Sequence, residues 1–252
     1  MGGLARKATI LEQLNNEGIN PLILDAGDLL FKKNVLDPGV TLDVSKVNAE
    51  IIIDSFNEMG CDAFSPGSKD FAGGLDFILS QYKKSTFPFL SCNITNKTGE
   101  LIFEPYVIIE KSNINVGIIG LTSVFDNNEI EILDPIASLR NILKEVSNKS
   151  DVVVLLFNAT QQDLTKLYNN DFEIDMILSS RGRTRSSDGG AGIPTYIAGD
   201  RGKLLYKFDL NIVDKNLPFI DLAWCENTIK RVGDRLEKMK QGNPNANLIQ
   251  LY

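Results

Sequence analysis

Polar residues capable of chemistry follow four apolar segments of this sequence. In chain order they are Asp28, Ser68, Lys69, Asp70, Asn158, Arg181 and Arg183. Strands that end in such loops line up their side chains along one sheet edge, the usual position of a site in α/β proteins. A hydrolase with two divalent ions ~4 Å apart would need a bridging carboxylate and several neutral donors at that edge. Asp28 is the residue that we expect to bind a metal, if one is bound.

The other positions lack side chains suited to metal binding. None of the 252 residues is histidine, which also excludes a serine-hydrolase triad. Lys69, Arg181 and Arg183 are cationic, and their side chains only donate hydrogen bonds. Because three cations repel a dication, the sequence argues against tight binding of two metal ions at this place. We therefore expect no cofactor.

Three interpretations of the basic residues stay open. Lys69, Arg181 and Arg183 can form internal ion pairs with Asp28 and Asp70, an arrangement that buried charges tolerate when they are well hydrogen-bonded. If the cations outnumber the acids, the same three residues can bind a phosphate or sulfate, as guanidinium groups do. The third interpretation is retained chemistry. We favour internal pairing because arginine cannot act as a ligand.

Composition and charge narrow the class of protein. A length of 252 residues with a hydrophobic fraction of 43% is enough for one large domain or two small ones. The net charge of −7 disfavours nucleic acid as a partner. No apolar run reaches the ~18 residues that a spanning helix needs, so we expect no insertion into a membrane. The three cysteines are far apart, so neither a disulfide framework nor a zinc knuckle is indicated.

Helical and strand-like patterns alternate along the chain, which predicts an α/β fold. We expect helices at 3–17, from a cap at Asp43 to a stop at Gly60, at 135–147 and around 164–168. We expect strands at 21–25, 87–93, 106–110, 115–121, 151–157, 174–178, 194–198 and 204–213.

The C-terminal part carries a separate pattern. After a boundary near residue 216, apolar residues recur at spacings of three and four: Leu222, Cys225, Ile229, Val232, Leu236 and Met239. This narrow stripe predicts a helix that packs on another surface. We divide the chain into a domain at 1–215 and an amphipathic helix with a tail at 216–252. Packing of the helix on its own domain is favoured over packing of residues 219–239 on an unknown protein partner or on a missing domain.

Four of these segments, in this order, resemble the 5′-nucleotidase family of calcineurin-like metallophosphoesterases. Residues 24–28 match the family's G-D element, and residues 60–71 match the stretch that ends in G-N-H-E/D-F. Residues 155–158 fall where a family strand ends in a histidine ligand, and residues 177–184 fall on the G-H-x-H-T element. The similarity covers about residues 2–213.

The resemblance implies roles for the polar residues and shows where this chain departs from the family. Asp28 takes the position of the metal-bridging carboxylate, and Asp70 keeps the acidic place. Ser68 replaces an asparagine ligand and Lys69 the catalytic histidine. Histidine positions are taken by Asn158, Arg181 and Arg183. The family's first metal loop would precede Gly2.

The resemblance implies an αββα sandwich of two mixed sheets flanked by helices, and a periplasmic or extracellular location, although this chain shows no signal peptide. We expect a catalytically degenerate domain that acts as a binding or interaction module. One alternative is a phosphate-ester (nucleotide) hydrolase that uses Mn²⁺, Zn²⁺ or Mg²⁺ with residues outside this chain. The other is a protein that binds a small anion.

Overall fold

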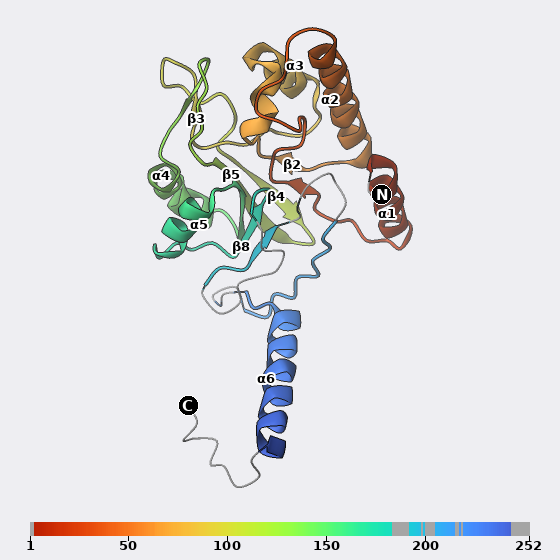
Figure 1. The fold of residues 1–252 in the computed structure, drawn as a ribbon, viewed down its shortest axis with the longest axis vertical. Coiled ribbons are helices and arrows are strands. Elements are labelled where there is room, and N and C mark those ends of the chain that lie inside the picture. The colour runs from red at the N-terminus through yellow and green to blue at the C-terminus, as the bar shows by residue number, and fades with distance from the viewer. Residues whose placement is uncertain are drawn as a thin grey trace.

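The computed structural model describes residues 3–182, 192–197, 199, 205–214, 217 and 219–242. Its main sheet has five strands (Figure 1). In spatial order they are β4 (Tyr106–Lys111), β5 (Ile114–Thr122), β7 (Val152–Asn158), β8 (Met176–Ser179) and β9 (Thr195–Ile197). The strand β4 runs antiparallel to β5, and the other pairs are parallel. The central strand β7 is apolar up to Asn158 and buried throughout, as expected for a strand covered on both faces.

Two helices cover one face of this sheet. They are α4 (Pro135–Ser147) and α5 (Gln161–Tyr168). The helix α4 begins at the predicted residue because Asp134 accepts a hydrogen bond from the backbone N–H of Ala137, and Pro135 occupies the first turn. Leucines of both helices pack against the strand residues Ile119, Leu155 and Phe157.

A second, smaller β layer lies on the opposite face. In it, β1 (Leu24–Asp25) pairs in parallel with β2 (Ala63–Phe64), and the pairing continues through a bridge from Phe64 to Phe89. A separate antiparallel pair joins β3 (Ile94–Thr95) to β6 (Glu131–Ile132). Ala63 and Leu90 of this layer pack against Ile118 and Leu156 of the main sheet.

Further helices cover the outer side of the small layer. They are α1 (Leu4–Asn16), α2 (Val40–Met59), the 3₁₀ helix η1 (Ser68–Gly73) and α3 (Leu75–Lys84). Phenylalanines fill the core beneath α2, η1 and α3, with Phe64 and Phe89 in edge-to-face contact at 4.8 Å between ring centroids. The order helix, sheet, sheet, helix confirms the expected αββα sandwich.

The structure differs from the sequence-based prediction in three local details. Gly39, not Asp43, precedes α2, so Asp43 lies in the first turn of the helix. Residues 87–93 form isolated bridges instead of a strand, because Phe89 and Leu90 contact different neighbours, Phe64 and Glu104. Residues 205–213 form no strand either, and the aromatic rings there pack on Tyr196. Leu204 lies outside the described residues.

The C-terminal helix α6 (Leu222–Gly242) has the expected position along the chain but does not pack as expected. None of its residues is buried, and it extends away from the sandwich (Figure 1). The prediction that it docks on its own domain is therefore wrong. Among the residues that the structure describes, no helix is long and apolar enough to cross a membrane.

The contact between the two sheets generates a stability prediction at Gly120. A Cβ atom at this position would lie 2.0 Å from the backbone carbonyl oxygen of Leu90. The variant Gly120→Ala should therefore lower the free energy of unfolding by about 2 kcal/mol or more, as overpacked cores do. Urea denaturation measures this loss. In the control Gly117→Ala the nearest atoms belong to the side chains of Val146 and Ser150, which can move, so its loss should be smaller. Equal losses would contradict the prediction.

Candidate functional site

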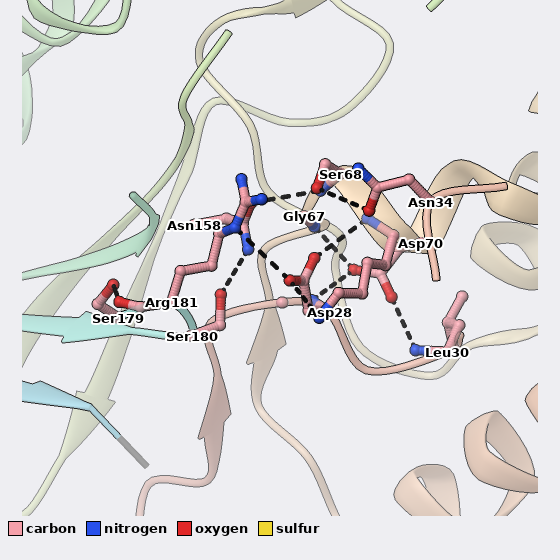
Figure 2. A network of polar contacts seen from close by, with 12 residues as sticks. Asp28, Leu30, Asn34, Gly67, Ser68, Asp70, Asn158, Ser179, Ser180 and Arg181 are labelled. Atoms are coloured by element: carbon pink, nitrogen blue, oxygen red, sulfur yellow. Dashed lines mark hydrogen bonds and ion pairs between the residues drawn. The ribbon is translucent and has the colours of Figure 1, made fainter. Parts of the chain in front are cut away.

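The carboxyl ends of β1, β2, β7 and β8 bring the polar residues together (Figure 2). Asp28 lies in the loop after β1, and Ser68, Lys69 and Asp70 form the start of η1 after β2. Asn158 ends β7, and Arg181 follows β8. The predicted site residues therefore meet at one sheet edge. Arg183 lies outside the described residues.

Asp28 is at the centre of the site and is held by two cations. Its side chain is only 5% exposed, and its Oδ2 atom lies 3.2 Å from Lys69 Nζ and 3.9 Å from Arg181 Nε. Its Oδ1 atom accepts a hydrogen bond from the backbone N–H of Lys69 at 3.1 Å. Among the described residues, Oδ2 accepts no hydrogen bond, so ion pairing compensates its burial.

Asp70 is fully buried and organises the loops around Asp28. Its Oδ2 atom accepts backbone N–H groups of Asp28 at 2.8 Å and Gly67 at 2.7 Å, and its Oδ1 atom accepts that of Leu30 at 2.7 Å. The sequence-based interpretation made Asp70 a partner of the cations. That part is wrong for the described residues, where both of its oxygens face backbone N–H groups.

Burial raises the pKa of Asp70 to about 7. The neighbouring charge of Asp28 adds to this rise, whereas the hydrogen bonds from Leu30 and Gly67 favour the ionised form.

Close backbone approach requires glycine at position 67. A Cβ atom there would lie 2.5 Å from Asn158 Nδ2 and 2.6 Å from Asp28 Oδ1. Asp28 itself has a φ of 57°, in the left-handed region that aspartate adopts more readily than most residues. The site is therefore tightly packed around its central carboxylate.

Asn158 links the two sheets. It is fully buried, its Oδ1 atom accepts the backbone N–H of Ser68 at 3.3 Å, and its Nδ2 atom donates to Ser180 Oγ at 2.6 Å. Ser68 Oγ in turn donates to Asn34 Oδ1 at 3.4 Å.

The sequence analysis missed Asn34 and the role of Ser180 in this network. Ser180 lies two residues after the predicted strand at 174–178, and this position is a usable signal. Asn34 lies in a loop and carries no such signal in the sequence.

The geometry leaves few free oxygens for a metal ion. The described residues contain no group of three or more His, Cys, Asp or Glu side chains able to hold one. The carboxylates of Asp28 and Asp70 and the amide oxygen of Asn158 already accept or pair with protein groups. The side chains of the described residues therefore do not by themselves form a centre for two divalent ions.

The hydrogen bonds of Asp70 generate a second prediction. In Asp70→Asn the amide offers one acceptor oxygen, and its NH₂ group faces a backbone donor, so at least one buried N–H loses its partner. The free energy of unfolding should fall by about 1–3 kcal/mol. Denaturant titration measures the loss, and the exposed substitution Asp37→Asn serves as the control. No difference between the two variants would contradict the role assigned to Asp70.

The raised pKa of Asp70 gives the same variant a pH readout. The folded protein holds this proton more tightly than the unfolded chain, where the pKa is about 4. The stability that Asp70 contributes should therefore be fully present below about pH 4 and lost as the pH rises through about 7. Asp70→Asn should lack this part of the pH dependence. Parallel pH profiles for parent and variant would contradict it.

Known proteins resemble this chain over much of its length. No protein-family profile matches it. A 5′-nucleotidase of Vibrio cholerae is 31% identical over 160 residues, which are 58% of this chain and 28% of that protein. The chain spans about a third of the length of the first curated relatives that it matches.

Solved structures share the fold. The calcineurin-like phosphoesterase YfkN of Bacillus subtilis matches with a TM-score of 0.61 and 24% identity, over 78% of this chain and 72% of that chain. A putative 5′-nucleotidase of Staphylococcus aureus matches with a TM-score of 0.65 and 17% identity, over 79% of this chain and 43% of that one. The sequence matches and the shared αββα sandwich lead to one conclusion. The chain is similar in sequence to 5′-nucleotidases and shares its fold with calcineurin-like phosphoesterases.

Proposed function

We propose that this domain is a catalytically degenerate member of its family and works as a binding or interaction module. The observation that carries the proposal is the pair of cations at Asp28. Lys69 and Arg181 approach the carboxylate of Asp28, the residue that the family resemblance places at the metal-bridging position. To bind this carboxylate, a divalent ion would have to displace both cations from it. The ion would then still lie close to their positive charges.

The chemistry of the donor atoms supports this proposal. Metal ions bind lone pairs, and protonated lysine and arginine have none to give. Asn158 keeps an amide oxygen at the site, but that oxygen accepts the backbone N–H of Ser68. Opening both the ion pairs and this hydrogen bond would expose a buried carboxylate and a buried amide together. Loss of both cations would leave the nearly buried carboxylate of Asp28 without a compensating charge, which is destabilising.

The alternative is a metal-dependent hydrolase of phosphate esters that uses Asp28 together with residues outside this chain. Purified protein should show no turnover of a generic phosphate ester with added Mn²⁺ beyond that of Asp28→Ala. Metal analysis should find no stoichiometric metal, and EDTA should leave the thermal midpoint unchanged. Turnover that disappears in Asp28→Ala would overturn the proposal.

Anion binding is a second candidate, favoured by an imbalance of charge at the rim. Lys69 and Arg181 are 32% and 33% exposed, whereas Asp28 between them is nearly buried. Two other acids lie nearby, Asp25 and Asp70, and burial raises the pKa of both, that of Asp70 to about 7. Asp70 is also hydrogen-bonded to the backbone. Two accessible cations therefore share the carboxylate of Asp28, which leaves positive charge available to a phosphate or sulfate.

Thermal shift with phosphate or sulfate tests this candidate. The midpoint should rise relative to sodium chloride of equal ionic strength, and the double variant Arg181→Ala with Arg183→Ala should lose the rise. The control Arg231→Ala with Arg235→Ala, on the distant helix α6, should keep it. An unchanged midpoint in the parent would exclude the anion site.

We also propose a periplasmic or extracellular location. The similarity to 5′-nucleotidases supports this assignment.

A further inference from the structure

The helix α6 is attached firmly to the domain at its first turn. Asp221 caps it by accepting the backbone N–H of Trp224 at 2.8 Å, and it also accepts a hydrogen bond from the hydroxyl group of Tyr196 at 2.9 Å. Phe219, just before the helix, packs against the core between the two sheets. The helix therefore leaves the domain from a fixed base, although none of its own residues is buried.

Beyond this base, α6 presents an apolar stripe to solvent. Ile229 is 72% exposed and Leu222 is 69% exposed. The stripe consists of Leu222, Cys225, Ile229, Val232, Leu236 and Met239. Its spacing of three and four residues places Leu222, Ile229 and Leu236 at the a positions of a heptad, and the other three at the d positions. This is the pattern of a two-helix seam, and the helix is about 30 Å long.

We propose that the stripe pairs with the same stripe of a second copy of this chain, in antiparallel orientation. The charges that flank the stripe decide the orientation. In a parallel pair, Arg235 at a g position would lie beside Lys240 at the following e position of the second copy, and like charges there are unfavourable. In an antiparallel pair the e positions face each other, so Glu226 of each copy lies on the same flank as Lys240 of the other. The dimer then contains two such Glu226 and Lys240 pairs, one for each copy.

In the antiparallel arrangement, every apolar residue of the stripe lies level with an apolar residue of the second copy. Alignment of Ile229 with Val232 of the second copy places Cys225 level with Leu236 and Leu222 level with Met239. The pairing is symmetric, as required for a closed dimer in which both copies use one surface. Gly233 adds no side chain beside the centre of this seam, and a Cβ atom there would meet nothing within 4 Å. The inference concerns a surface remote from Asp28, and a mass measurement tests it independently of catalysis.

Solution mass is the first test. By light scattering, the purified full chain should have the mass of two copies, and Leu236→Asp should reduce it to the mass of one. The variant should remain folded, because Leu236 contributes to no buried core. The control Asn227→Asp changes the opposite, polar face of α6 and should leave the dimer intact.

Disulfide mapping is the second test and reports orientation. Under mild oxidation, Leu236→Cys should form a covalent dimer, because the new thiol lies level with Cys225 of the second copy. The parent should form none, since its two Cys225 residues would be separated by about 16 Å along the seam. Leu236→Cys in a Cys225→Ser background is the matched control and should not crosslink. Cys61 and Cys92 are buried, which protects them from oxidation.

Three results would overturn the proposal. A parent chain with the mass of one copy would show that the stripe does not self-associate. Crosslinking of the parent through Cys225 would show a parallel pair. A dimer that persists in Leu236→Asp would place the interface elsewhere, for example on the exposed valines of α2.

Discussion

The ion pairs between Asp28 and the cations Lys69 and Arg181 are the constraint on which the rest of the site depends. A buried carboxylate must be compensated, and in the family resemblance metal ions would serve that purpose. Here two side chains supply the positive charge from η1 and from the end of β8. Permanent cations can stabilise the carboxylate and the loops around it, but they cannot polarise a phosphate ester as a Lewis acid does. This difference between a cation and a Lewis acid is the physical basis of the proposed non-catalytic role.

Asp70 explains how the loops stay in place around this centre. One carboxylate satisfies three backbone N–H groups from segments about 40 residues apart in the chain. Such a hub is needed because irregular loops have no ladder partners for their backbone groups. Gly67 lets the loops approach closely enough for Asn158 to reach Ser68 from the neighbouring sheet. Scaffold and site are therefore one hydrogen-bonded unit, whatever the site now binds.

The sequence predicted the elements whose patterns are local. The helix α4 could be bounded because Asp134 and Pro135 form a start signal, and the strands β5 and β7 could be located because they are continuous apolar runs. Prediction failed for two segments. In one, neighbouring residues pair with different parts of the chain, and in the other, aromatic rings pack together without forming a strand. Residues 87–93 have the composition of a strand, but their neighbours Phe64 and Glu104 lie on different segments. Tyr206 and Phe208 alternate like strand residues, yet they pack on Tyr196.

By itself the sequence determined the chemical types at the site, because the absence of histidine and the presence of Lys69 and Arg181 depend on no geometry. It also indicated that the loops carrying them meet, since parallel strands end at a common edge. Only the tertiary structure decided the partners: Asp28 for the cations, and backbone N–H groups for Asp70. It also decided that the stripe on α6 is not covered by its own domain. Side-chain partners and burial depend on contacts between segments far apart in the chain, and no local pattern encodes these contacts.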